Sequence, residues 1–472
     1  MQFYSTRNIN NKVKGHEAIL SGIASDGGLY LPSTYLKFDL EKHLDDDYET
    51  LAFNILSYYF DEFDEAELKE AIHKAYTTFE SKDVTPLFKC GDDYILELFH
   101  GPTCAFKDIA LELLPHLLSM AIKLKNQDSL ILTATSGDTG KAALAGFKDV
   151  GHTNLFVFYP LNGVSKAQER QMLTSEGQNV RVIGVKGNFD DCQKAVKQAM
   201  TSKELISYLE EYNLHFSSAN SINIARLLPQ CVYYFDAYYK LVKEGVINLY
   251  DKVNFTVPTG NFGNILAGYI ASLMGLPVNK LIMASNRNNI LYDFMNSGTY
   301  DTHRIFHKTN SPSMDIIVSS NLERLLSLLI NDDHKLKRLM NDLNEKGIYT
   351  IDDTLKSKIN DIFYAGFTDE TSTVKTIRNC FDDFGYILDP HSAVGYKVMK
   401  EYPNPQKNIN ILLSTASPYK FKETIKEAGI ALDMAKAPLS IKELDSKPVL
   451  HNINIEREDI IPCIRELIKT LK

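Results

Sequence analysis

Lys107 is the residue of this sequence whose chemistry depends most on its surroundings. It lies in the segment 99–108, after an alternating apolar run at 94–98 that predicts a strand and before an apolar run at 109–114 that predicts a helix. A Gly-Pro pair predicts the turn between them. In a desolvated pocket such a lysine loses its proton more readily and can act as a nucleophile or as a Schiff-base amine. On this segment alone a solvated lysine is the better explanation, because charged side chains are rarely buried.

A glycine-rich turn follows the predicted strand 253–258 and precedes the predicted helix 265–271. This order brings backbone N–H groups and the positive end of a helix dipole to one place, and that geometry binds phosphate. Glycines in the turn let the backbone approach an anion closely. The alternative is an ordinary strand-to-helix turn. The candidate residues are Gly260, Asn261, Phe262, Gly263 and Asn264.

A second turn of the same type lies between the predicted strand 130–134 and the predicted helix 141–147. Two such turns in one α/β unit indicate two anionic groups, such as a cofactor phosphate and a substrate phosphate or carboxylate. Alternatively, one of the two is only a turn. The candidate residues here are Ser136, Gly137, Asp138 and Thr139.

Two further segments carry hydrogen-bonding side chains. Residues 220–226 include Ser221, Asn223 and Arg226, and a guanidinium can bind phosphate through two parallel hydrogen bonds. A helix N-cap followed by a surface arginine explains this segment equally well. Thr415, at the end of a predicted late strand, offers a neutral hydroxyl that could hydrogen-bond a pyridine nitrogen. For Thr415 alone, a helix N-cap is the better explanation.

The composition is that of an ordinary globular protein. Of 472 residues, 44% are hydrophobic and 24% charged, and the net charge of −9 argues against nucleic acid as a partner. No run of 18 apolar residues predicts a membrane span, and the first residues show no signal peptide. Six cysteines without a Cys-x-x-Cys pair favour a reducing cytoplasm. The run Asp45-Asp46-Asp47 predicts a helix start rather than a metal site.

Strands and helices alternate through the middle of the chain, which predicts parallel sheets with helices on both faces and ligands at the carboxyl ends of the strands. By length we expect two to four domains. They are a small N-terminal unit at 1–83, a catalytic domain at 84–430 and a C-terminal segment at 431–472. Further strands are predicted at 155–160, 180–185 and 409–413, and further helices at 51–60, 66–79, 190–200 and 456–471, with residues 320–383 mostly helical.

Together these segments resemble the threonine synthase family, whose members are pyridoxal-phosphate (PLP) enzymes with the tryptophan-synthase-β type of fold, called fold type II. The resemblance runs from end to end, with the matches in the expected order. The matching segments are Tyr4-Ser5-Thr6-Arg7 with residues 26–32, His100-Gly101-Pro102-Thr103 with Phe106-Lys107-Asp108, Ser136-Gly137-Asp138-Thr139-Gly140, Gly260-Asn261-Phe262-Gly263, and Ser414-Thr415-Ala416.

The resemblance implies an α/β fold with two lobes of mostly parallel sheet, flanked by helices, and a small N-terminal domain. The lobe at roughly 110–225 would be mobile. Lys107 would bind PLP covalently, the turn at 260–264 would cradle its phosphate, and Thr415 would face its pyridine nitrogen. The turn at 136–139 would bind the substrate carboxylate. The substrate phosphate would be held by Ser221, Asn223 and Arg226.

The implied reaction converts O-phospho-L-homoserine and water into L-threonine and phosphate, with Lys107 moving protons at Cα and Cβ. One alternative is a PLP-dependent phospho-lyase that releases a 2-oxo acid. A second is a non-catalytic anion-binding protein that kept the fold, against which the intact Lys107 counts. We expect a monomer or homodimer in the cytoplasm, acting on a small molecule without nucleic-acid or membrane partners.

Overall fold

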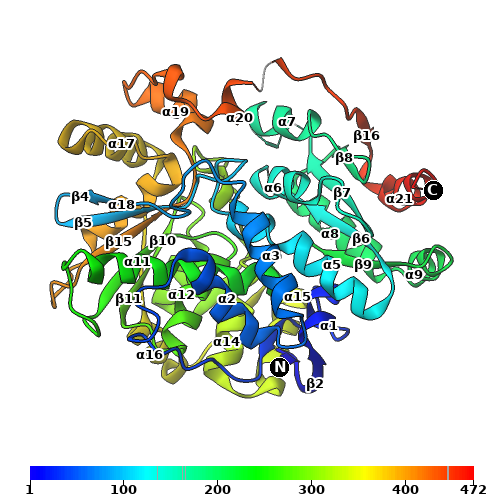
Figure 1. The fold of residues 1–472 in the computed structure, drawn as a ribbon, viewed down its shortest axis with the longest axis horizontal. Coiled ribbons are helices and arrows are strands. Elements are labelled where there is room, and N and C mark those ends of the chain that lie inside the picture. Colours follow the sequence, from blue (N-terminus) through cyan, green and yellow to red (C-terminus); the bar gives the residue numbers. More distant parts are fainter. Residues whose placement is uncertain (136, 162, 165, 444–445, 472) are drawn as a thin grey trace.

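Two sheets of mostly parallel strands, each flanked by helices, lie side by side and define two lobes (Figure 1). The computed structural model describes residues 1–135, 137–161, 163–164, 166–443 and 446–471. We call the lobe built on the six-stranded sheet the first lobe and the lobe built on the five-stranded sheet the second lobe. This arrangement confirms the predicted fold class.

The sheet of the first lobe contains one antiparallel edge pair, β4 with β5, and is otherwise parallel. Three of its strands, β5, β10 and β15, were predicted. Residues 320–383 are mostly helical, as predicted, but they also contain β14, which pairs with β11 because the partner strand, rather than the local sequence, decides the conformation of so short a segment. The strand order is β14 (Phe363–Phe367), β11 (Val278–Ser285), β10 (Val253–Pro258), β15 (Asn410–Ser414), β5 (Asp93–Glu97) and β4 (Leu87–Cys90).

The sheet of the second lobe is parallel throughout. Successive residues of β6 serve opposite faces: Leu130 and Leu132 pack with the buried residues of α8 and α21, whereas Ile131 joins the main core with those of α6. The strand order is β16 (Ile453–Ile455), β8 (Val180–Val185), β7 (Thr153–Pro160), β6 (Asp128–Ala134) and β9 (Leu214–Ser218), and the helices are α6 (Asp138–Phe147), α8 (Phe189–Thr201) and α21 (Ile460–Lys469).

The N-terminal region adds a small antiparallel sheet and three helices beside the two lobes (Figure 1). The predicted helices at 51–60 and 66–79 are confirmed to within a few residues. Asp47 caps α2 by accepting a hydrogen bond of 2.8 Å from Thr50 N, so the aspartate run does mark a helix start. The elements are β1 (Gln2–Ser5), β2 (Asn8–Lys14), α1 (Gly15–Ser21), β3 (Tyr30–Pro32), α2 (Tyr48–Tyr59) and α3 (Glu65–Tyr76).

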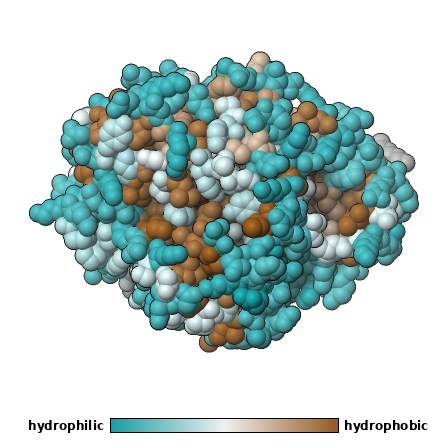
Figure 2. All heavy atoms as spheres, turned by 90° about the horizontal axis from the view of Figure 1, so that it is seen from below, coloured by the Kyte–Doolittle hydropathy of each residue, from teal (hydrophilic) through white to brown (hydrophobic). Residues whose placement is uncertain are grey.

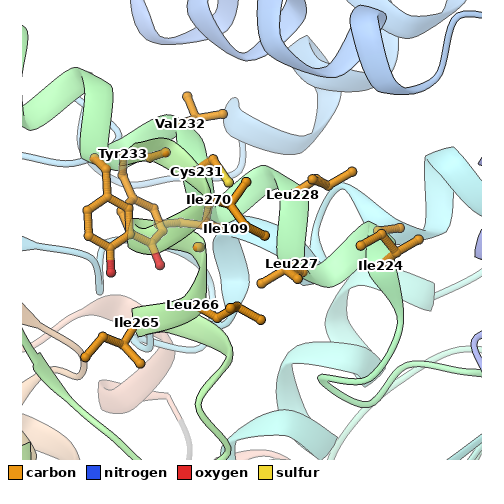
Figure 3. Packing of buried hydrophobic residues seen from close by; sticks show 14 of the residues in the cluster. Ile109, Ile224, Leu227, Leu228, Cys231, Val232, Tyr233, Ile265, Leu266 and Ile270 are labelled. Atoms are coloured by element: carbon orange, nitrogen blue, oxygen red, sulfur yellow. The ribbon is translucent and has the colours of Figure 1, made fainter. Parts of the chain in front are cut away.

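A buried apolar cluster holds together the starts of the helices that carry the predicted site residues (Figure 3). It joins Ile109 of α4 (Asp108–Leu111), Leu227 of α10 (Ile224–Leu227), Val232 of α11 (Val232–Lys243) and Leu266 of α12 (Gly263–Leu273). Because close-packed side chains leave little freedom for such helices to shift, the cluster fixes Lys107, Arg226 and Asn264 relative to one another.

The remaining helices cover the outer faces of the two sheets or link the strands. They are α5 (Leu114–Lys125), α7 (Lys166–Leu173), α9 (Lys203–Glu210), α13 (Ile290–Ser297), α14 (Leu322–Ile330), α15 (Asp333–Lys346), α16 (Asp353–Ile362), α17 (Glu370–Phe384), α18 (Pro390–Glu401), α19 (Lys422–Glu427) and α20 (Leu439–Lys442), and a two-stranded sheet pairs β12 (Thr299–Asp301) with β13 (Ile348–Thr350).

The surface is mostly hydrophilic on the face shown in Figure 2, where apolar residues gather in patches near the middle. None of the helices within the described ranges combines the length and the apolar character needed to cross a bilayer. Across those same ranges, no three His, Cys, Asp or Glu side chains are grouped so that they could hold a metal ion.

Candidate active site

A cavity of about 1000 Å³ brings together most of the predicted site residues. Gly137, Asp138 and Asn223 do not line it, and Ser136 lies outside the described residues. The cavity therefore collects side chains from both lobes and from segments far apart in the sequence. Those that line it are Lys107, Thr139, Ser221, Arg226, Gly260, Asn261, Phe262, Gly263, Asn264 and Thr415.

Lys107 directly precedes α4, and among the described residues its amine has no hydrogen-bond partner. The pKa of this amine is lowered to about 8, mainly by burial; the Arg226 and Lys420 charges contribute to the shift, and the carboxylates of Asp138 and Asp108 oppose it. A lysine with such a pKa is neutral in a large fraction of molecules near pH 8. Of the two explanations that the segment alone left open, the structure supports the desolvated lysine over the solvated one.

The loop before Lys107 is held by hydrogen bonds to Asp108 and to Thr415. Asp108 accepts hydrogen bonds from the Thr103 N–H at 2.9 Å and the Thr103 hydroxyl at 2.5 Å. Gly101 is required here, since an added Cβ would lie 2.5 Å from Asp108 Cβ. On the other side Phe106 N donates to Thr415 O at 2.9 Å. These contacts place the lysine segment and the end of β15 against each other.

The turn between β10 and α12 turns its carbonyl groups away from the cavity. Ser319 Oγ donates to Gly260 O at 2.7 Å, and the backbone N and side-chain Nδ2 of Asn321 donate to Asn261 O at 3.1 and 3.0 Å. Phe262 takes the left-handed conformation with φ of 62°. The first N–H groups of α12 are consequently left for an anion in the cavity.

Asn264 adds a side-chain donor to this turn. Its Oδ1 accepts hydrogen bonds from the hydroxyls of Tyr233 at 2.6 Å and Tyr234 at 3.0 Å, which fixes the orientation of the amide. Its Nδ2 is buried and has no partner among the described residues. An unpaired buried donor is costly, so this atom fits a site for a negatively charged ligand.

Arg226 presents a second unpaired donor to the cavity. Its Nη1 donates to Ala219 O at 2.5 Å, whereas its Nε is buried without a partner in the described part of the chain. Burial lowers the pKa of the guanidinium to about 10. The residue is only 2% exposed, so the interpretation as a surface arginine is excluded.

Asn223, unlike Arg226, has a structural role. Its Oδ1 accepts from Ala225 N at 3.0 Å, which caps α10, and its Nδ2 donates to the carbonyls of Ile19 and Ser218, both at 2.9 Å. All its hydrogen-bonding groups are engaged within the protein. The helix-cap explanation that the sequence left open is therefore the one the structure supports for Asn223.

Asp138 also points away from the cavity. Its Oδ1 lies 2.5 Å from Lys420 Nζ and accepts from Gln168 Nε2 at 3.0 Å, while its Oδ2 accepts from Ser313 Oγ at 2.9 Å. Although burial alone raises the pKa of the Asp138 carboxyl, the Lys420 and Lys107 charges outweigh it and hold the pKa well below its usual range. Lys420 carries no recognisable sequence motif and was not predicted.

Thr415 and His391 complete the wall near Lys107. Thr415 N donates to Ser392 Oγ at 3.2 Å, and the Thr415 hydroxyl has no partner among the described residues. His391 Nδ1 is hydrogen-bonded to Asp389 Oδ1 at 2.8 Å, and His391 Nε2 accepts a hydrogen bond from the Ser313 N–H at 3.1 Å. His391 was not predicted; it steadies the Ser313 segment, whose carbonyl lies against Gly260.

Arg324 hydrogen-bonds to three segments around the site. It was not predicted from the sequence. It is fully buried and donates to Tyr30 O at 2.9 Å, to Asn321 Oδ1 at 2.5 Å and to Ile222 O at 2.5 Å. One guanidinium thus ties the N-terminal sheet, the support of the β10–α12 turn and the segment that carries Arg226.

Comparisons with known proteins cover nearly the whole chain. The family model "Threonine synthase N terminus" matches residues 2–76, "Pyridoxal-phosphate dependent enzyme" matches 82–414, and "Threonine synthase, C-terminal" matches 392–457. The three matches follow one another along the chain, and the second and third overlap at residues 392–414.

Individual relatives agree with the family models. The threonine synthase of Pseudomonas aeruginosa is 38% identical over 436 residues, covering 91% of this chain and 91% of that protein. The threonine synthase of Eremothecium gossypii is 37% identical over 470 residues, covering 91% and 90%. The crystal structure of a PLP-bound threonine synthase from Brucella melitensis superposes with a TM-score of 0.91 at 37% identity, covering 100% of this chain and 99% of that one. The chain therefore belongs to the threonine synthase family of PLP-dependent enzymes.

Proposed function

We propose that this enzyme converts O-phospho-L-homoserine and water into L-threonine and phosphate, the last step of threonine biosynthesis. The observation that carries the proposal is the cavity itself. It holds a desolvated lysine amine together with two separate groups of anion donors that have no partner among the described residues, one at the start of α12 and one at Arg226. A substrate with its own phosphate needs the second set in addition to the one for the cofactor.

The donor set at the start of α12 fits PLP. Lys107 would hold the cofactor covalently, and the free N–H groups of residues 261–264 with the unpaired Asn264 Nδ2 would hold its phosphate. The free hydroxyl of Thr415 would face the pyridine nitrogen without forcing its protonation. When bound, PLP supplies an electron sink for the pair released at the substrate Cα.

The substrate would lie across the cavity. Arg226 and Ser221 would bind its phosphate, and Thr139, at the start of α6, would bind its carboxylate through its backbone N–H group and its hydroxyl. We do not propose Gly137 as a contact, because it does not line the cavity and its N–H donates to Thr135 Oγ1 at 3.0 Å. Asp138 would not touch the carboxylate, because two carboxylates repel and Asp138 is already paired with Lys420. Asn223 would not contact the substrate, because its side chain is engaged within the protein.

The chain's own residues would then perform the proton and leaving-group chemistry. With a pKa of about 8 and no hydrogen-bond partner among the described residues, the Lys107 amine can accept a proton from Cα and then one from Cβ, and loss of the Cβ proton accompanies departure of the phosphate from Cγ. Arg226, whose side chain is buried, would stabilise the negative charge of the departing phosphate. Protonation at Cγ, water addition at Cβ and reprotonation at Cα would complete the reaction.

Further proposals concern the domain boundaries, lobe closure, the oligomeric state and the location in the cell. We propose domains at 1–83, 84–430 and 431–472, with the lobe at roughly 110–225 closing over the substrate. We also propose a monomer or homodimer in the cytoplasm, which the free thiols of all six cysteines support. Hydrogen–deuterium exchange with and without substrate tests the closure.

The direct test is to incubate the holoenzyme with O-phospho-L-homoserine and to measure threonine and inorganic phosphate together. We expect the two products in equal amounts. Phosphate with a 2-oxo acid and ammonia instead of threonine would assign the phospho-lyase reaction. Absence of turnover, with no borohydride-dependent labelling of Lys107, would support a non-catalytic anion-binding protein.

A further inference from the structure

We propose that Lys420 is a positioning residue of the active site, and that its buried ion pair with Asp138 locks the start of α6, in the second lobe, to the Lys107 loop of the first lobe. Lys420 closes the 3-10 turn Pro418–Lys420, shortly after β15, and Asp138 is the first residue of α6. The contact therefore crosses from one lobe to the other.

Lys420 Nζ makes two contacts at once. It lies 2.5 Å from Asp138 Oδ1 and donates to Thr103 O at 3.0 Å. Thr103 belongs to the loop that Asp108 pins before Lys107. One ammonium thus holds both the loop that carries the proton-transferring amine and the helix start proposed to bind the substrate carboxylate.

Asp138 accepts hydrogen bonds from both lobes in addition to its ion pair with Lys420. Ser313, from the first lobe, and Gln168, from α7 of the second lobe, both donate to this carboxylate. The Lys420 and Asp138 side chains are 1% and 3% exposed. Burying two charges costs a large desolvation free energy that their attraction only partly offsets, so such a pair adds little stability but fixes geometry.

The same pair adjoins Lys107 electrostatically. The charged groups that face the Lys107 amine are Asp138 on α6, Arg226 on α10, Asp108 on α4 and Lys420. The Asp138 carboxylate raises the pKa of Lys107, and the Lys420 ammonium lowers it. Substituting one partner at a time should therefore shift the titration of Lys107 in opposite directions.

The first experiment titrates Lys107 in the full-length chain after removal of the cofactor. Reaction of its amine with acetic anhydride is followed across pH by peptide mass spectrometry. We expect Lys420→Met to raise the midpoint and Asp138→Asn to lower it, whereas Lys422→Met, an exposed neighbour, leaves it unchanged. Midpoints that coincide in the wild type and both variants would overturn the electrostatic part of the proposal. This readout does not depend on the proposed reaction.

The second experiment separates positioning from folding and rests on the proposed function. In the holoenzyme we expect Lys420→Met to raise KM for O-phospho-L-homoserine about 10- to 100-fold through misplacement of α6, with Lys420→Arg restoring part of the loss. The double variant Asp138→Asn with Lys420→Met removes both buried charges, so its thermal stability should recover while its KM stays high. Recovery of KM together with stability would show a purely structural pair and overturn the proposal.

Discussion

The two strand-to-helix turns of the cavity share their local design but differ in what holds them. The β10–α12 turn is supported by neutral hydrogen bonds from Ser319 and Asn321, both in the first lobe that also contains the turn. The β6–α6 turn is supported by a charged contact from the opposite lobe, through Lys420. The first is fixed within one rigid unit, whereas the second depends on how the two lobes meet.

The difference in support matches two tasks, binding the cofactor and binding the substrate, for which the two turns have similar sequences. A resident cofactor benefits from a preorganised site, because its phosphate stays bound through every turnover. A substrate must enter and leave, so the turn that binds it benefits from an anchor that holds only when the lobes are together. The predictions below test whether the two turns divide the work in this way.

The largest effect is expected at Lys107. Lys107→Ala should lower kcat by up to ~10⁴-fold, because the proposed mechanism assigns the protons at Cα and Cβ to no other side chain among the described residues. Phosphate release from O-phospho-L-homoserine measures the loss, and circular dichroism should show an unchanged fold. Turnover within tenfold of the wild type would contradict the central role of Lys107.

The next effect should separate the substrate phosphate from the cofactor phosphate. Arg226→Ala removes charged hydrogen bonds worth about 1.5–3 kcal/mol each, so KM for the substrate should rise about 10- to 100-fold. The cofactor dissociation constant, measured by visible absorbance, should stay within twofold. Arg338→Ala on the exposed face of α15 is the control. Loss of cofactor with unchanged KM would place Arg226 at the other anion site.

A matched pair of glycine substitutions compares the two turns directly. In Gly260→Ala the new Cβ would lie 2.9 Å from Ser313 O, and in Gly137→Ala it would lie 2.4 Å from Gln168 Cδ at a φ of 127°. Overpacking of this kind costs about 1–3 kcal/mol. We expect the first variant to weaken cofactor binding and the second to raise KM while keeping the cofactor. Identical kinetic defects would erase the distinction between the turns.

The smallest effect is expected at Thr415. Thr415→Val removes one neutral hydrogen bond of about 1 kcal/mol, so kcat should fall about fivefold, and Thr415→Ser should retain the wild-type rate. The visible spectrum of the bound cofactor reports the same contact independently. A spectrum and rate identical in all three proteins would place the hydroxyl away from the pyridine ring.

Local sequence patterns predicted the elements that contain the site, because alternation and glycine-rich turns are local signals. β5, β10 and the turn at 260–264 lie where those patterns indicated. The sequence could not show that Lys420 would pair with Asp138, since 282 residues separate them. Nor could it show Arg324, whose acceptors include two backbone carbonyls that any residue could supply.

Asn223 and β14 show two further limits of local reasoning. A helix cap and a substrate-binding amide have the same local signature before α10, and only the three engaged hydrogen bonds of Asn223 distinguish them. β14 is a strand because β11 offers an open edge beside it, which is a tertiary effect.

The position of β16 has a consequence for synthesis of the protein. Its neighbour β8 ends at Val185, yet the outer edge of β8 remains unpaired until residues 453–455 have been made. At a ribosomal rate of about 5–20 residues per second, that edge would stay exposed for many seconds. An unpaired edge strand is a template for aggregation, so the nascent second lobe should be a preferred client of chaperones.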